Sequence, residues 1–203
     1  MLTFYHSPMT RSTRILALLK ELDALDRVEI RRVSIARVDG TGQADPANPH
    51  PEGKVPVLVH DGVMIRESSA IALYLTDLFP AAGLGPKVGE SQRGAYLSWL
   101  AWYGDVMEPV YVLTAAGIDH PMARATFRGM PEVEARLAEA LADGRHFLLG
   151  DRYSAADLIV ASPFGFFRDS IPADPKVRAW IERCLARPAT AWANDEDARA
   201  MAA

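Results

Sequence analysis

Cysteine is almost absent from this chain: Cys184 is the only one among 203 residues. An intrachain disulfide, a zinc site built from several thiolates and a Cys-x-x-Cys redox pair each require at least two cysteines, so all three are excluded. A chain without structural disulfides fits a reducing compartment. We therefore expect a soluble, cytoplasmic protein.

Long apolar runs and an excess of one charge are also missing. No stretch approaches the ~18 uninterrupted apolar residues of a membrane span, and Arg11 and Arg14 interrupt any apolar start of the signal-peptide kind. The 22 basic and 26 acidic residues are interspersed and give a net charge of −4, which argues against a nucleic-acid surface or an anionic membrane. We expect neither as a partner.

The chain does have enough apolar sequence for a core, at 49% of its residues. Its first part alternates strand and helix patterns, and Asp61-Gly62 between two short apolar runs favours a tight hairpin turn. The expected order is a strand at 2–5, a helix from about 12, a strand at 28–35, paired strands at 55–59 and 63–65, and a helix from 68.

The stretch PAAGLGPKVG, residues 80–89, holds three glycines and two prolines and is the best linker candidate. Helical spacing dominates after it, and Ser154-Ala-Ala-Asp157 has the pattern of a capping box. The tail after Trp192 is polar or alanine-rich, and we expect it to be loosely held. We predict an α/β domain at 1–79, a linker at 80–89 and an all-helical domain at 90–203.

The segment SPMTRSTR, residues 7–14, joins the first strand to its helix, and a helix N-terminus favours an anion. Thr10 and Ser12 offer hydroxyl groups and Arg11 a guanidinium, so a bound thiol would be pushed toward its thiolate. One charge-assisted hydrogen bond, worth about 1.5–3 kcal/mol, would lower a thiol pKa from about 8.5 to about 7. The alternative is an ordinary helix cap by Thr10 or Ser12 with solvated arginines.

Pro56 stands inside an apolar run that otherwise reads as a strand. If the Val55–Pro56 peptide is cis, the backbone of Val55 is available to pair with an extended ligand. The alternative is an ordinary proline on an edge strand. Lys54 would meet a carboxylate or simply be solvated.

The triplet Glu67-Ser68-Ser69 opens an apolar helix. The N–H and hydroxyl of Ser68 at a helix start suit a carboxylate, and Glu67 suits an ammonium group, so together they fit the zwitterionic end of an amino acid. The alternative is an acidic first turn with a serine cap, which stabilises any helix.

Taken in order, SPxxRSxR, GKVPVL, ESSAIALYL and LLGDRYSAADLIVA resemble the cytosolic glutathione transferases from Leu2 to about Leu185. The resemblance implies a thioredoxin-like domain followed by an all-helical domain. It also implies a symmetric homodimer, with glutathione as co-substrate, a small hydrophobic electrophile as second substrate and no metal.

The resemblance assigns roles to single residues. Val55, before an expected cis Pro56, would pair with the cysteinyl backbone of glutathione, and Glu67 and Ser68 would hold its γ-glutamyl end. Lys54 and His50 would lie near the glycyl end. The capping box would serve folding. Candidates for the electrophile site, with core packing as the alternative, are Tyr103, Met107, Val110 and Tyr111.

The catalytic position departs from the family pattern. Arg11 stands where the bacterial cysteine-type enzymes have their cysteine, and Ser12 lies beside it. Aligning on Arg14 instead puts Thr10 where the serine-type enzymes have their serine, while Tyr5 lies early for the tyrosine-type role. We predict that Ser12 contacts the sulfur, with Thr10 as second choice and Arg11 assisting.

The function implied is activation of the glutathione thiol as a thiolate and its conjugation to a small apolar electrophile. Glutathione-dependent peroxide reduction, dehalogenation or isomerisation would fit the same site, although the Ser-Ser-Cys run of the isomerase-type members is missing. A second class is a catalytically weak or inactive protein of the same fold that binds glutathione for regulation. A third, a helical interaction protein with no glutathione affinity, has little support.

Overall fold

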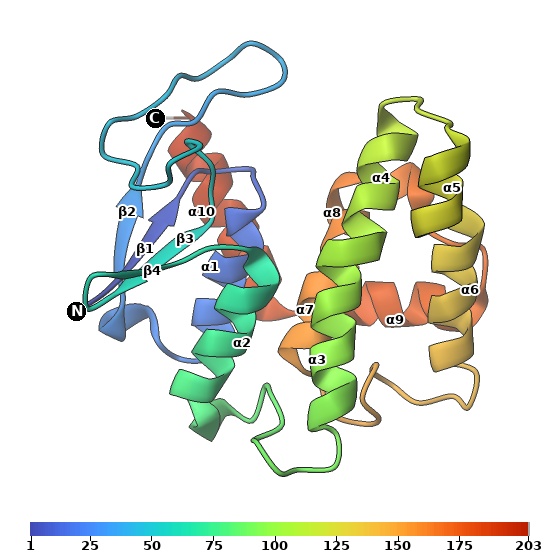
Figure 1. Cartoon of the computed structure of the whole chain (residues 1–203). Helices are drawn as coiled ribbons and strands as arrows, with labels where there is room; N and C mark the ends of the chain where they lie inside the picture. Colours follow the sequence, from blue (N-terminus) through green and yellow to red (C-terminus); the bar gives the residue numbers. More distant parts are fainter. Residues whose placement is uncertain (203) are drawn as a thin grey trace. The chain divides into compact units, whose positions relative to one another are not determined.

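The computed structural model describes residues 1–202, and its contacts divide the chain into two compact units. Unit 1 comprises Met1–Gly83 together with the chain from Ala186 onward, and unit 2 comprises Leu84–Leu185 (Figure 1). In the described part, 1–202, no helix is both long and apolar enough to cross a membrane.

Unit 1 is built on a mixed four-stranded sheet in the order β2-β1-β3-β4. β1 pairs in parallel with β2, and the β1–β3 and β3–β4 pairs are antiparallel. The elements are β1 (Leu2–His6), α1 (Ser12–Glu21), β2 (Glu29–Arg32), β3 (Val57–His60), β4 (Val63–Ile65), α2 (Ser68–Leu78) and α10 (Pro188–Ala202), with short 3₁₀ turns at Leu25–Arg27 and Pro80–Ala82. The predicted α/β order is confirmed.

Local sequence explains why these elements form. α1 has apolar residues at i, i+3, i+4 and i+7, and all four (Ile15, Leu18, Leu19 and Leu22) are buried. Each such side chain contributes about 1.5–3 kcal/mol when it leaves water. β3 begins at Val57, directly after Pro56, because proline has no N–H to give to the ladder.

The C-terminal tail corrects the sequence prediction of a loosely held segment. Residues 188–202 form α10, which packs against α1 (Figure 1). Ala193 and Asp197 on this helix are wholly buried. Arg187, just before it, donates to both carboxylate oxygens of Glu21. Alanine brings the two helix backbones close, and the partners of Asp197 are too distant in sequence for any local pattern to reveal. By contacts the tail therefore groups with the α/β unit, whereas we expected it in the helical domain.

Unit 2 is helical: α3 (Arg93–Trp102), α4 (Glu108–Ala115), α5 (Pro121–Phe127), α6 (Met130–Ala140), α7 (Ala155–Ala161), α8 (Pro163–Phe166) and α9 (Pro175–Leu185), with a 3₁₀ turn at Arg168–Ser170. A wide π turn, Tyr103–Met107, joins α3 to α4. Pro109 follows it, where a residue without an N–H disturbs the regular helical ladder.

The predicted capping box at the start of α7 is confirmed. Asp157 accepts hydrogen bonds from the N–H of Ser154 at 2.9 Å and from its hydroxyl at 2.8 Å. It also accepts from the N–H of Leu148 at 2.8 Å and from the indole N–H of Trp180 at 2.9 Å. One wholly buried carboxylate thus joins α7, α9 and the preceding loop.

Candidate functional site

Three segments singled out in the sequence meet at one edge of the unit 1 sheet. Tyr5 pairs with Val57 across β1 and β3, and Leu58 pairs with Ile65 across β3 and β4. Continuing the β1–β3 register by two residues places Val55 opposite the loop after β1. Continuing the β3–β4 register by three residues places Val55 opposite the start of α2. The hydroxyl-rich loop, the Val55–Pro56 peptide and the Glu67-Ser68 pair are therefore neighbours.

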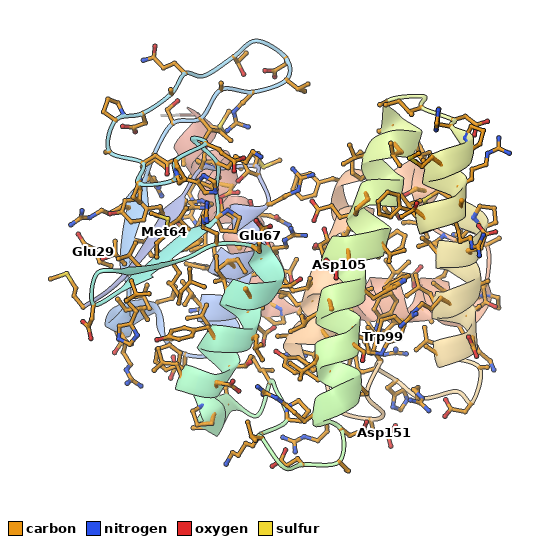
Figure 2. The ribbon with its side chains drawn as sticks, viewed as in Figure 1. Glu29, Met64, Glu67, Trp99, Asp105 and Asp151 are labelled. Atoms are coloured by element: carbon orange, nitrogen blue, oxygen red, sulfur yellow. The ribbon has the colours of Figure 1, made fainter. Side chains whose placement is uncertain are left out.

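The start of α2 presents opposite charges side by side. Glu67 is exposed and directly precedes the helix, with φ +67° (Figure 2). The hydroxyl of Ser68, which is buried, accepts a hydrogen bond from Nη2 of Arg14 at 2.9 Å. The first N–H groups of a helix have no partner within it, so this end attracts an anion, and the Arg14 guanidinium adds positive charge. A carboxylate and an ammonium on one ligand find matching partners here.

The Val55–Pro56 peptide is cis. The loop before it is held by its own side chains: the amide of Asn48 donates to the carbonyl of Lys54 at 3.2 Å and accepts from the N–H of His50 at 3.0 Å. Nδ1 of His50 in turn accepts from the N–H of Glu52 at 3.0 Å. His50, which is buried, therefore braces this loop.

Lys54 is exposed and forms an ion pair with Glu52, with Nζ and Oε2 2.6 Å apart. The hydrogen bond from Lys54 holds the pKa of the Glu52 carboxyl below its ordinary value. The lysine charge is thus partly matched within the loop itself, and exposure leaves it free to turn toward another carboxylate.

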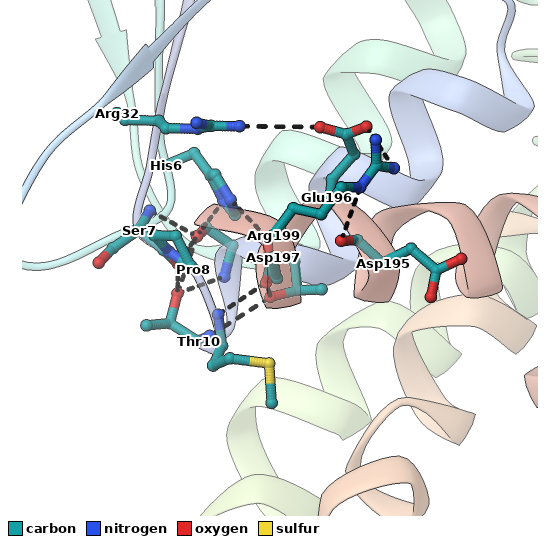
Figure 3. Close-up of polar contacts among 12 residues, drawn as sticks. His6, Ser7, Pro8, Thr10, Arg32, Asp195, Glu196, Asp197 and Arg199 are labelled. Carbon is teal, nitrogen blue, oxygen red and sulfur yellow. Dashed lines mark hydrogen bonds and ion pairs between the residues drawn. The ribbon is translucent and has the colours of Figure 1, made fainter. Parts of the chain in front are cut away.

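The loop after β1 and the start of α1 bring two hydroxyl groups together, those of Thr10 and Ser12. Oγ of Ser12 lies 2.7 Å from Nδ1 of His6 and 2.8 Å from Oγ1 of Thr10, and it accepts from the N–H of Ser7 at 3.1 Å (Figure 3). The hydroxyl of Thr10 donates to the carbonyl of Ser7 at 2.7 Å. The N-cap of α1 is Arg11, which makes no side-chain cap, but the hydroxyl of Thr10 accepts from the N–H of Ser12 at 3.2 Å and so caps the first turn, as the alternative interpretation expected.

Comparisons with known proteins agree on the class of protein. Residues 1–87 match the model of the glutathione S-transferase N-terminal domain, and residues 122–183 match that of the C-terminal domain. The chain is 31% identical to glutathione S-transferase aclG of Aspergillus oryzae, over 70% of this chain and 72% of that protein. This chain belongs to the glutathione S-transferase family.

Other proteins are similar over two thirds of this chain or more. Protein LigF of a Sphingobium strain is 27% identical over 69% of this chain and 73% of its own. A glutathione transferase of Methylococcus capsulatus superposes with a TM-score of 0.74 at 29% identity, covering 98% of this chain and 100% of that one. A sphingomonad glutathione S-transferase, solved in complex with glutathione, gives a TM-score of 0.75 at 27% identity, covering 97% and 98%. The thioredoxin-like domain and the helical domain are thus those of the family.

The residues predicted to contact the sulfur in this family member differ in accessibility. Ser12 is wholly buried, and its hydroxyl is enclosed by protein groups. Thr10 is half-buried and Arg11 is exposed. Tyr5 packs with Val33, Val55 and Val57 in a buried cluster. Of the two hydroxyl candidates, Thr10 is the one whose side chain is partly exposed.

The electrophile candidates are all buried within unit 2: Tyr103, Met107, Val110 and Tyr111. Tyr111 packs against Phe164 and Phe167 and accepts a hydrogen bond from Ser170 at 3.2 Å. Burial raises the pKa of Tyr111 to about 12, so its phenol stays protonated at neutral pH. Packing accounts for this set, and a role toward an electrophile stays a prediction.

Sequence reasoning missed three residues at this site. Arg14 was given no role in binding, and only the alternative of a plain helix cap treated it as solvated, whereas it is buried and bonded to Ser68. His6 and Asp197 were not considered, although both are buried and lie 2.8 Å apart. A histidine at the end of the first strand was the only local signal. The aspartate lies 191 residues away, where no spacing rule connects the two.

Proposed function

We propose that this family member binds glutathione at the edge formed by residues 7–14, Val55–Pro56 and Glu67-Ser68, activates its thiol and adds the thiolate to a small apolar electrophile. The observation that carries the proposal is the convergence of these three segments in unit 1, with Arg14 bonded to Ser68 at 2.9 Å. Membership of the family supports it, as does the sphingomonad relative solved with glutathione.

The proposed binding roles follow from charge and backbone geometry. Glu67 takes the ammonium and Ser68, backed by Arg14, takes the carboxylate of the γ-glutamyl end. Val55 pairs with the cysteinyl backbone in the manner of an added strand beside Pro56. Lys54 turns from Glu52 toward the glycyl carboxylate. His50 acts through the loop that it braces.

Thiol activation is assigned to the loop after β1. The partial positive charge at the N-terminus of α1 and the hydroxyl of Thr10 favour a thiolate over a thiol, and the thiol proton leaves to solvent. The thiolate then attacks an electrophilic carbon, forming a carbon–sulfur bond as the leaving group departs with the electron pair. Ser12 supports Thr10 through their 2.8 Å contact, and Arg11 adds positive charge.

The principal alternative is a protein that binds glutathione without turnover, which the same geometry would serve. Peroxide reduction is the other: two glutathione molecules become a disulfide while the peroxide is reduced to an alcohol and water. The proposal extends to a cytoplasmic homodimer, which sedimentation of the purified protein tests.

The test is calorimetric titration of the purified protein with glutathione. Glu67→Gln keeps the side-chain size at this positive-φ position and removes the charge, and a charged hydrogen bond of about 1.5–3 kcal/mol predicts affinity lower by roughly 10- to 150-fold. Glu29→Gln, another exposed acid of unit 1, is the matched control and should bind like wild type. Absence of heat, with no competition by an S-alkyl glutathione, would refute glutathione binding.

Turnover is tested separately with a panel of aryl halides, enones and organic peroxides. Wild type, Thr10→Val and Ser12→Ala should bind glutathione similarly, and Thr10→Val should lose most of the conjugation rate. Binding without turnover on any member of the panel would favour the regulatory alternative.

A further inference from the structure

Asp197 ties the C-terminal helix to the loop of the candidate site. It is wholly buried on α10, and its Oδ1 lies 2.8 Å from Nε2 of His6. Its Oδ2 accepts from the N–H of Met9 at 2.6 Å and from the hydroxyl of Thr13 (Figure 3). One carboxylate therefore contacts the end of β1, the loop and the first turn of α1.

The contact with Met9 matters because of its backbone. Met9 has φ +55°, a conformation that residues with a side chain rarely adopt. Its side chain is exposed and so does not hold it there by packing. The buried carboxylate that accepts its N–H does hold it, and Met9 directly precedes Thr10.

A chain of polar groups continues from the carboxylate to Thr10. Nδ1 of His6 lies 2.7 Å from Oγ of Ser12, which lies 2.8 Å from Oγ1 of Thr10. Asp197, His6 and Ser12 are buried, and only the last member of the chain, Thr10, is partly open.

The direction of the protons along this chain follows from the carboxylate. Burial raises the pKa of Asp197, but hydrogen bonds from His6, Thr13 and Met9 outweigh it and hold that pKa below its ordinary value. An ionised carboxylate only accepts, so Nε2 of His6 carries a proton, and in the neutral ring Nδ1 is then an acceptor. The hydroxyl of Ser12 then has two acceptors in reach, Nδ1 of His6 at 2.7 Å and the carbonyl of Ser7 at 3.0 Å, and the shorter contact favours His6. The hydroxyl of Thr10 donates to the carbonyl of Ser7 at 2.7 Å, so its proton has to leave that carbonyl to reach a ligand.

Ser12, His6 and Asp197 follow the order of a serine hydrolase triad, but a wholly buried serine does not reach a substrate. The charged neighbour Glu196 on α10 has partners of its own: it contacts Arg32 of β2 at 3.7 Å and Arg199 of α10 at 2.8 Å. Lys20 of α1 lies over the ring of Trp192.

We propose that Asp197, acting through His6 and Met9, is a positioning residue that holds the loop so that Thr10 directs its hydroxyl at the sulfur of bound glutathione. The proposal rests on the proposed function. It makes α10, the last helix of the chain, a working part of the thiol site.

The experiment follows the ultraviolet absorbance of the thiolate in protein-bound glutathione as a function of pH, together with glutathione affinity. Asp197→Asn keeps the shape but offers His6 an amide N–H, which reverses the direction of the chain. We expect affinity within about threefold of wild type and a bound-thiol midpoint higher by about one pH unit, a tenfold loss of thiolate near neutrality. Asp195→Asn, an exposed acid on the same helix, should leave both unchanged.

A second variant covers the possibility that Asp197→Asn folds poorly. His6→Gln keeps a donor near Asp197 and removes the acceptor that faces Ser12, so the midpoint should move in the same direction. Hydrogen exchange of residues 7–13 without ligand should be faster in Asp197→Asn than in Asp195→Asn.

The outcomes separate this proposal from the one on which it rests. If wild type lowers the titration midpoint of the bound thiol and the variants have the same midpoint as wild type, the positioning role is overturned and the proposed function stands. If the variants have lower glutathione affinity and a lower melting temperature but an unchanged thiol midpoint, the positioning role is also overturned, because that result indicates a purely structural role. Wild type that binds no glutathione overturns both.

Discussion

Asp157 in unit 2 and Asp197 in unit 1 are both wholly buried and both accept several hydrogen bonds, yet their pKa values move in opposite directions. The donors to Asp157 are neutral: backbone N–H groups, a hydroxyl and an indole. Burial prevails there and raises the pKa of Asp157. Asp197 also faces the imidazole of His6, and hydrogen bonding prevails over burial.

The difference separates two uses of a buried acid. Asp157 contacts residues of one helical unit that lie at most 23 positions from it, and these partners are all buried. Asp197 instead joins the end of the chain to a loop 188 and more positions away, beside a partly open hydroxyl. We interpret the first as an anchor of the fold and the second as an anchor of a site.

The largest expected effect is on stability at Asp157. Asp157→Ala leaves four buried donors without their acceptor, and we expect a loss of about 3–5 kcal/mol in the free energy of unfolding, measured by urea denaturation. Asp151→Ala, whose side chain is 84% exposed, should stay within about 0.5 kcal/mol of wild type. If Asp157→Ala lowers the free energy of unfolding by less than about 1 kcal/mol, Asp157 is not an anchor of the fold and its contrast with Asp197 is lost.

Asp197→Ala should cost less, about 1–3 kcal/mol, because a terminal helix is able to detach locally while the rest stays folded. Hydrogen exchange should accelerate in α10 and in residues 7–13. Exchange in α9, which belongs to unit 2, should not change. Equal acceleration in α9 would show that this aspartate anchors the whole fold, as Asp157 does.

The two acids should also respond differently to pH. A lowered folded-state pKa gives stability that is complete above the unfolded value of about 3.9 and is lost only as pH falls through the folded pKa. A raised folded-state pKa gives stability that is greatest below about 3.9 and declines as pH rises toward the folded pKa.

Urea titrations of wild type, Asp157→Asn and Asp197→Asn between about pH 4 and pH 7 test this. The difference between wild type and Asp157→Asn should shrink with rising pH. The difference for Asp197→Asn should stay level across this range and shrink only below it. Parallel behaviour of the two variants would contradict the opposite pKa directions.

The smallest expected effect concerns the second anchor of α10. Arg187→Gln breaks the bidentate ion pair between Arg187, 30% exposed, and Glu21, 10% exposed. It should lower the free energy of unfolding by about 1 kcal/mol, and by less at high salt. Arg199→Gln, 67% exposed, serves as control and should cost less than about 0.5 kcal/mol. Combined with Asp197→Ala, the Arg187 effect should add, because Glu21 and Thr13, their respective contacts on α1, lie at opposite ends of that helix. Strong non-additivity would mean that α10 docks as one unit.

Local sequence predicted much of the α/β unit. The helix starts at Ser12 and Ser68 and the strand at 63–65 agree with the structure, since burial on one face repeats at fixed spacing along the chain. The strand expected at 28–35 is shorter, Glu29–Arg32, and α5, α8 and α10 were not predicted. Short or alanine-rich helices carry little apolar periodicity, so their sequence gives no comparable signal.

The sequence by itself determined the order of strands and helices, the family and the capping box, because each is written in residues a few positions apart. The tertiary structure decided which polar groups meet. It enclosed Ser12, placed Arg14 behind Ser68 across 54 positions and joined Asp197 to His6 across 191. A hydrogen bond depends on the distance between two groups in space. Residues so far apart in sequence come together only when whole helices pack, and no local sequence pattern indicates that packing.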